Sequence, residues 1–278
     1  SFFKDVCERF VKNKRAMIAL VIFLIIALMA IFVPMISPYS YDGMDTAIMN
    51  QRPSTAHWFG TDRFGRDLFT RVLYGARISL MVGIVTAVIN TIIGVIYGGI
   101  AGYVGGRVDM WMMRLTDILY SIPELLYIIL IMLIFGSNVR SIIIGVCVAG
   151  WISMARMVRS QIITLKEQEF ALAAFVLGAN SRRILFKHLI VNSLGTIIVT
   201  VTLMIPQAIF MEAFLSFVGV GISAPMASLG TLAQDARTYL EIFPYQMLFP
   251  VAAICVTIFS LNFIGEGLNS ALNPKGKR

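Results

Sequence analysis

Long apolar runs alternate with polar intervals along this chain. The longest apolar stretches are Ala16–Ile36, Ile78–Gly106, Asp109–Phe135, Ser141–Met157, Leu189–Gly219 and Tyr245–Gly265. An α-helix needs roughly 20 residues to cross a bilayer, and these stretches reach or approach that length. The pattern therefore predicts an all-α polytopic membrane protein with about six transmembrane helices.

Two of the polar intervals predict further elements at the membrane. At the end of the connection Ser37–Arg77, the segment Asp67–Ala76 predicts an amphipathic helix that lies in the interface. Its inward face would carry Phe69, Val72 and Leu73, and its outward face Arg66, Asp67 and Arg71. Residues 219–245 are rich in Gly, Ser and Pro and moderately apolar, which favours a partly inserted re-entrant segment.

The interval Arg156–Asn192 predicts a helix, a tight turn and a second helix at the membrane surface. It is strongly basic, and Gln168–Leu177 consists of good helix formers without Pro or Gly. Gly178 stands where a helix ends in a left-handed residue, and Asn180 or Ser181 can cap the helix that follows. On these residues alone, an ordinary amphipathic cytoplasmic loop remains the simpler interpretation.

Composition agrees with a membrane protein and explains the positive charge. The 278 residues are 58% hydrophobic and 14% charged, with a mean hydropathy of +0.82, whereas soluble proteins are about one quarter charged. With a cytoplasmic N-terminus, 16 of the 23 lysines and arginines fall on the cytoplasmic side and 7 on the other. Because basic residues favour that side, both termini are predicted to be cytoplasmic. The net charge of +8 then follows from topology, and nucleic acid is not expected as a partner.

The sequence contains no recognisable catalytic or metal-binding set. His57 and His188 are predicted on opposite sides of the membrane, and the three cysteines lie far apart. The GxxxxGK[ST] loop that cradles nucleotide phosphates is missing. We therefore expect a non-catalytic subunit that binds no cofactor itself, with any ATP hydrolysis on another polypeptide.

Charged residues within the predicted spans are candidates for a substrate path or a subunit interface, because a charge in hydrocarbon is costly. These candidates are Asp117, Glu124 and Glu212. Ser121 and Glu124 have the spacing of a capping box that would break the third span. A place for Glu124 on the substrate path is the alternative, and the two are compatible. Arg114 and Asp117, three residues apart, predict an ion pair.

The basic interval also resembles a known motif. Leu172-Ala173-Ala174, then Gly178 four residues on, then Phe186-Lys187-His188-Leu189, is similar to the "EAA" loop of the membrane subunits of ABC importers. Leu172 departs from the Glu of that motif, and Val191 from its usual Pro. In that family the loop is a coupling helix that docks into a separate cytoplasmic ATPase. The resemblance gives the coupling role to Glu169, Leu172, Ala173, Ala174, Gly178, Arg182 and His188.

Other stretches resemble the same family and follow in the same order. They are an N-terminal helix, the Gly-Thr-Asp-x-x-Gly-Arg-Asp segment at 60–67 with Gly75–Ser79 behind it, Met211–Ile222, and Leu261–Lys275. Together these ordered landmarks resemble the second-type ("C") permease subunit of oligopeptide and dipeptide ABC importers, within the binding-protein-dependent transport inner-membrane component family.

The resemblance implies the type I ABC importer permease fold. It divides the chain into residues 1–77 (first helix, extracytoplasmic connection, interfacial helix), a permease core at 78–270 with the coupling loop at 156–191, and a basic cytoplasmic tail at 271–278. The implied partners are a sister permease in a heterodimer, two cytoplasmic ATPase subunits that bind ATP and Mg, an extracytoplasmic substrate-binding protein and membrane lipid. The implied function is ATP-driven passage of peptides across the inner membrane of a prokaryote by alternating access.

Alternative functions remain open. Permeases for nickel or glutathione share these landmarks. An ion-driven secondary transporter would require inverted repeats and paired ionisable residues at the bilayer midplane, which the sequence does not show. A non-transporting membrane scaffold would not need helices rich in Gly and broken by Pro.

Overall fold

The computed structural model describes residues 2–272, which fold as helices and connections without a β-strand in that range. The elements are α1 (Phe2–Lys12), α2 (Lys14–Ile36), η1 (Thr46–Ile48), α3 (Leu68–Val104), α4 (Gly106–Tyr120), α5 (Glu124–Phe135), α6 (Val139–Ala149), α7 (Trp151–Lys166), α8 (Glu169–Val176), α9 (Ser181–Arg183), the π-helical turn η2 (Ile184–Leu189), α10 (Ile190–Val218), α11 (Leu229–Arg237) and α12 (Tyr245–Leu272). Within the described residues, five helices are long and apolar enough to cross a membrane, or six when the bent pair α4–α5 counts as one span. The predicted all-α membrane architecture is confirmed.

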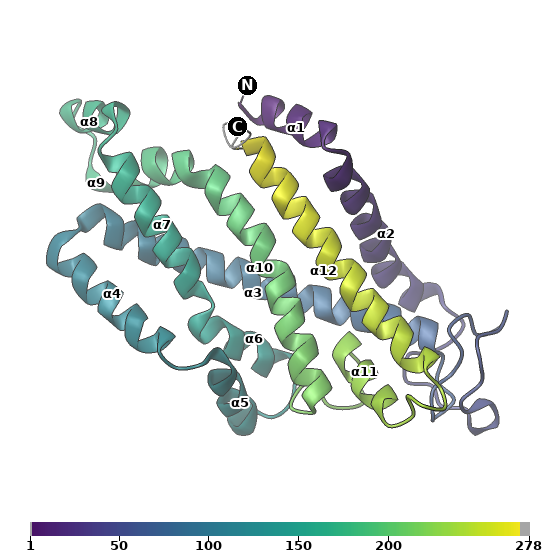
Figure 1. The fold of residues 1–278 in the computed structure, drawn as a ribbon. Coiled ribbons are helices and arrows are strands. Elements are labelled where there is room, and N and C mark those ends of the chain that lie inside the picture. Colours follow the sequence, from purple (N-terminus) through teal and green to yellow (C-terminus); the bar gives the residue numbers. More distant parts are fainter. Residues whose placement is uncertain (1, 273–278) are drawn as a thin grey trace.

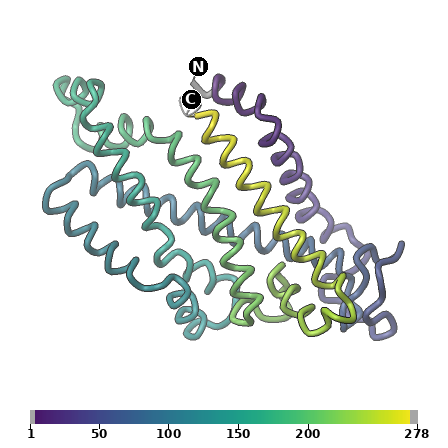
Figure 2. The backbone as a smooth tube through the Cα atoms, viewed as in Figure 1, coloured from purple at the N-terminus to yellow at the C-terminus, as the bar shows by residue number. Residues whose placement is uncertain are grey.

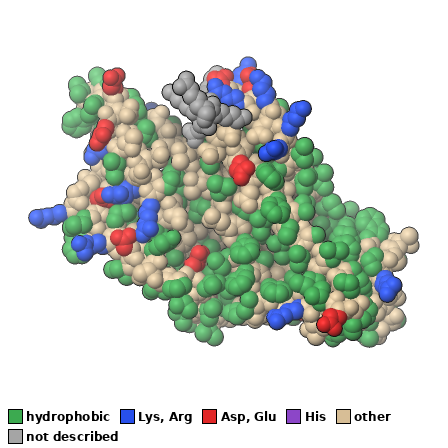
Figure 3. Space-filling view, in the orientation of Figure 1, with side chains coloured by type: hydrophobic (Ala, Val, Ile, Leu, Met, Phe, Trp, Pro, Cys, Tyr) green, Lys and Arg blue, Asp and Glu red, His purple; other side chains and the backbone are tan. Residues whose placement is uncertain are grey.

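Helix α3 is the central element of the bundle. It packs against α7 on one side and against α10 and α2 on others, while α12 lies between α10 and α2 (Figures 1 and 2). The start of α1 and the end of α12 lie at the same end of the molecule as α8 (Figure 1). The irregular segment before α3 lies at the other end (Figure 1). Exposed hydrophobic side chains cover much of the face seen in Figure 3. On α2, for example, Ile18, Leu24 and Phe32 are exposed, as expected for contact with lipid.

Glycines on α3 set its distance to α7. Gly94, Gly98 and Gly102 recur every four residues, so they share one face of the helix. A Cβ at Gly98 would lie 2.9 Å from both the carbonyl carbon and the Cα of Ala155 on α7, and still closer to its carbonyl oxygen. The two helix backbones are therefore in direct contact, as small residues permit in membranes.

The helix predicted at 67–76 forms from Leu68 onward, but it is not a separate element. The structure continues it without a break into the next span, so that α3 extends over 37 residues from Leu68 to Val104. Its supposed outward face is also buried, since Arg66, Asp67 and Arg71 are only 6%, 4% and 2% exposed. Amphipathic spacing predicted solvent for these residues, but their charges find partners inside the protein.

The third predicted span is broken, and the capping box that was to break it does not form. Helices α4 and α5 meet at an angle of 73°. Ser121 has helical dihedrals and its hydroxyl donates to the carbonyl of Ile118, so it ends α4 and does not cap α5. Pro123 occupies the N-cap of α5 and makes no side-chain cap bond. Pro123 contributes to the break, because it cannot donate within a helix and disfavours a helical conformation of the residue before it.

Several helices extend beyond the apolar runs that predicted them. Helix α7 continues to Lys166 and α12 to Leu272, and the basic N-terminal segment forms α1. Residues 219–245 contain the short helix α11, whose Leu229, Leu232 and Ala236 are buried against the bundle. The last six residues of the predicted basic tail, 273–278, lie outside the described residues. Apolar runs thus mark where helices meet lipid, while the helices themselves run on into polar surroundings.

Candidate functional site: the α8 loop and the central cavity

The α8 loop forms the helix–turn–helix that its sequence predicts. Gly178 adopts φ +82°, the left-handed region that favours glycine. The side chain of Asn180 caps α9 by accepting from the backbone N–H of Arg183 at 2.8 Å. The helix predicted at Gln168–Leu177 is observed as α8, Glu169–Val176. It is separate from α7, which ends at Lys166.

Helix α8 has one face on the bundle and one face free of contacts within the described chain. Ala171 is buried and Ala174 is half-buried against a cluster that includes Ile162, Ile184 and Leu185. The outer face and the turn behind it are apolar, with exposed fractions of 55% for Leu172, 69% for Phe175, 82% for Val176 and 86% for Leu177. This outer face lies at the end of the molecule opposite the segment before α3 (Figure 1).

The residues predicted to couple to an ATPase divide between these two faces. Leu172, Ala173 and Gly178 are exposed, as are Glu169 and Arg182 at the helix starts. Ala174 is half-buried and packs against the chain's own helices, and His188 is half-buried as well. Phe175, Val176 and Leu177 are the most exposed apolar residues of the loop, and the motif did not single them out; the signal was three bulky apolar residues in a row before a turn glycine.

A cavity of about 700 Å³ lies among α3, α5, α7, α10 and α12. Most of its lining is apolar, and its polar side chains include the amides of Asn90, Gln207 and Asn262. Glu124, at the start of α5, is the single charged residue that lines it in the described chain. The break between α4 and α5 places this carboxyl group at the cavity wall. A chamber of this size, mostly apolar with a few polar groups, is typical of a ligand site.

The other two predicted pathway residues lie elsewhere. Glu212 is fully buried within the chain, where its carboxyl group accepts from the hydroxyls of Ser79 at 2.6 Å and Ser216 at 2.8 Å, and so joins α10 to α3. Asp117 is exposed and pairs with Arg156 of α7 at 2.7 Å, not with Arg114. Neither residue lines the cavity.

Comparison with known proteins assigns the family. Residues 94–278 match the family described as "Binding-protein-dependent transport system inner membrane component", and residues 1–53 match the "N-terminal TM domain of oligopeptide transport permease C". The chain belongs to the binding-protein-dependent transport inner-membrane component family. It is therefore a multi-pass protein of the inner membrane.

Curated relatives align over the whole length of this family member. It is 49% identical to the oligopeptide transport system permease protein OppC of Bacillus subtilis, over 99% of this chain and 90% of the relative. It is 47% identical to the dipeptide transport system permease protein DppC of the same organism, over 100% and 87%. Identity to OppC of Escherichia coli K12 is 45%, over 100% and 92%.

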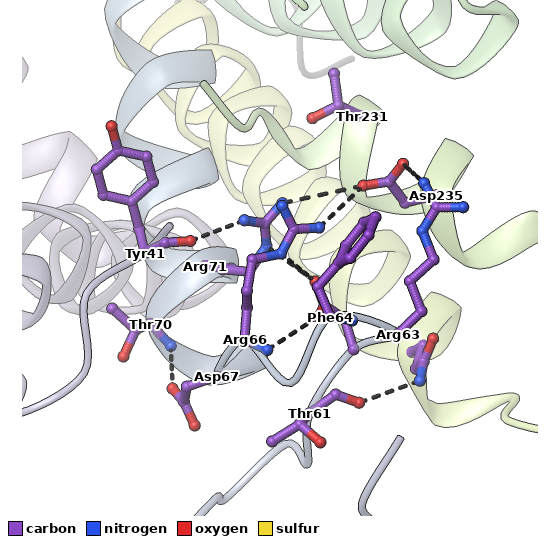
Figure 4. A network of polar contacts seen from close by, with 12 residues as sticks. Tyr41, Thr61, Arg63, Phe64, Arg66, Asp67, Thr70, Arg71, Thr231 and Asp235 are labelled. Carbon is purple, nitrogen blue, oxygen red and sulfur yellow. Dashed lines mark hydrogen bonds and ion pairs between the residues drawn. The ribbon is translucent and has the colours of Figure 1, made fainter. Parts of the chain in front are cut away.

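In this inner-membrane component, a cluster of buried and half-buried charges connects the segment before α3 with α11 (Figure 4). The Asp62 carboxylate accepts from Nε of Arg66 at 2.6 Å and lies 3.6 Å from Nε of Arg71. Asp235 on α11 lies within 4.0 Å of Arg63, Arg66 and Arg71. Sequence reasoning missed this cluster, because no local pattern links Asp235 to arginines more than 160 residues earlier.

A second pair anchors the same segment. Nδ1 of His57 lies 2.9 Å from the carboxylate of Asp67, and both side chains are buried. The other oxygen of Asp67 caps α3 by accepting from the backbone N–H of Thr70 at 2.8 Å. The resemblance had marked residues 60–67 without a reason, and the structure supplies one: they hold the start of α3.

Two ion pairs connect α4, the helix that leads to Glu124, with α7. Arg159 binds Asp109 through two nitrogens, and Asp109 has a side chain only 14% exposed. Asp117, the partner of Arg156, has a side chain 66% exposed. Bidentate, partly buried pairs contribute more than exposed pairs.

We expect Asp109→Asn to lower the free energy of unfolding by about 1–2 kcal/mol, and Asp117→Asn to lower it by less than about 0.5 kcal/mol. Thermal unfolding of the purified variants, compared at low and high salt, measures both. Asp117→Asn is the matched control, because it makes the same change on the same helix. Equal losses for the two variants would contradict the unequal roles of the pairs.

Proposed function

We propose that this chain is one half of the transmembrane path of an ABC importer of peptides. Relatives named as oligopeptide and dipeptide permeases align over nearly all of both chains and support the substrate class. The family name supports a separate substrate-binding protein. In this proposal a sister permease completes the path, and two cytoplasmic ATPases bind ATP and Mg and drive the transport.

The exposed apolar face of α8 is the observation that carries the proposal. Leu172, Phe175 and Val176 leave a hydrophobic ridge uncovered at one end of the protein, beyond the spans. Such ridges on polar-facing surfaces mark protein interfaces. Docking of an ATPase there also supports a cytoplasmic location for this end, and with it for both termini.

Alternating access then uses the parts already described. Closure of the ATPases pulls α8, and α7 and α10 connected to it move with it. Glycine contacts between α3 and α7 transmit that movement to the cavity. The segment before α3 lies at the end of the molecule opposite α8 (Figure 1), where the ion pairs of Asp62 and Asp235 hold it. In this proposal that end faces the binding protein.

The test is reconstitution of the complete importer in vesicles. We expect peptide uptake that needs ATP, the binding protein, the sister permease and the ATPases, with ATP hydrolysis stimulated by peptide. Omitting each partner in turn serves as the control. Uptake without the ATPases, driven by an ion gradient, would favour a secondary transporter, and uptake of nickel or glutathione in place of peptides would favour those permeases.

A further inference from the structure

The central cavity contains two hydrogen-bond acceptors that lack donors in the described chain. Glu124 is its single charged lining residue, and no hydrogen bond or ion pair is formed by its carboxylate within residues 2–272. Asn90 on α3 is only 3% exposed, and its Oδ1 is buried without a hydrogen-bond partner. Buried polar atoms are almost always satisfied, so the unpaired Oδ1 of this cavity-lining residue can accept from a ligand once the amide turns toward the cavity.

The Asn90 amide lies close to the junction between α6 and α7. A Cβ at Gly150 would lie 2.5 Å from Nδ2 of Asn90 and 2.6 Å from the carbonyl oxygen of Val146, so glycine leaves room for the amide here. Its Oδ1 is buried and has no partner in the described chain.

We propose that Glu124 and Asn90 bind a primary ammonium group of the transported peptide. An ammonium group offers three N–H donors and a positive charge, which complements one carboxylate and one amide oxygen. Charge-assisted hydrogen bonds of this kind are the strong ones in a cavity with apolar walls. This inference rests on the proposed function, in which the cavity is the peptide path.

The positive charge of Arg156, which lies near the cavity, does not prevent a cation from binding at this site. Arg156 lies over the ring of Tyr120, a cavity residue, at 4.6 Å, but its charge is already paired with Asp117. The remaining wall is mostly apolar, with side chains such as Met204, Met211 and Ile258, and its polar side chains, which include the amides of Gln207 and Asn262, carry no charge. The amino group is therefore the constant feature that the cavity reads, while the apolar wall accepts varied side chains.

The test measures equilibrium binding of labelled peptides to the permease–ATPase complex in nanodiscs without the binding protein, so that only the permease selects. The probes are tri-alanine, N-acetyl-tri-alanine and N-acetyl-Ala-Lys-Ala. We expect the wild type to bind tri-alanine at least about tenfold more tightly than its N-acetylated form, a difference of ~1.4 kcal/mol. Recovery of tight binding by the lysine probe identifies a side-chain ammonium as a second source of the ligand, and weak binding identifies the amino terminus alone.

Variants separate recognition from folding. Glu124→Gln should remove most of the preference for the free amine, whereas Glu124→Asp should keep it and Asn90→Asp should increase it. Glu8→Gln, the same change at an exposed position on α1, is the matched control and should leave binding unchanged. Equal binding of tri-alanine and its N-acetylated form by the wild type, or an unchanged preference in Glu124→Gln, overturns this inference alone. A wild-type complex that binds none of the probes overturns this inference too, while the proposed peptide path is decided separately by the reconstituted uptake experiment.

Discussion

Gly98→Ala is expected to lower the free energy of unfolding by about 3 kcal/mol, whereas Gly99→Ala is not. The added methyl group at Gly98 would collide with the backbone of Ala155, and a backbone cannot rotate away as a side chain can. At Gly99 the nearest atoms would be side-chain carbons at 3.6 Å, which is ordinary contact. Overpacking of this kind costs about 3 kcal/mol or more, a large share of a stability of roughly 5–15 kcal/mol.

The measurement is the yield of monodisperse protein in detergent, followed by its midpoint of thermal unfolding. Gly99→Ala controls for the general effect of replacing a helical glycine, which by itself stabilises a helix. If both variants gave the same yield and the same midpoint, α3 and α7 would be free to move apart without cost. Their close contact would then not be what transmits motion from α8 to the cavity.

The sequence predicted the spans well because lipid imposes a simple rule on them. A run of apolar residues such as Ala16–Ile36 has no other stable place, and α2 covers it with two further residues. The glycines of α3 are small residues of the kind that lets helices pack closely in lipid, but spacing alone could not tell that Gly98 meets α7 and that Gly99 does not. That distinction depends on which face of α3 the partner helix covers.

Charged residues were harder to place, because their environment depends on distant parts of the chain. Amphipathic spacing put Arg66 and Arg71 in solvent, but Asp62 and Asp235 make a buried position possible for both. The capping box at Glu124 followed a local rule, and Pro123 took the capping position instead. Local patterns thus located the break in the third span correctly, and they could not show that the break turns Glu124 toward a cavity formed with α3, α10 and α12.

Phe175→Arg is expected to abolish association with the ATPase subunits while leaving the permease folded. Phe175 is 69% exposed on the outer face of α8, so arginine there costs the isolated chain little. In a docked complex the same side chain would be buried in an apolar contact, where an unpaired charge is costly. Central aromatic residues of an interface contribute about 2 kcal/mol or more, so we expect at least a thirtyfold loss of affinity, on the order of 2 kcal/mol.

The experiment is a pull-down of the ATPase subunits by the tagged permease pair, together with ATP-dependent peptide uptake in vesicles. Val11→Arg, on the exposed side of α1 at the same end of the molecule, adds the same charge at a site 59% exposed and away from α8. It should retain both association and uptake. A second variant, Val176→Arg, repeats the test at a residue 82% exposed, which excludes a peculiarity of the aromatic position. Normal association and normal uptake for both α8 variants would show that the ATPase docks elsewhere, because an apolar contact could not bury an unpaired charge at either position without a large cost.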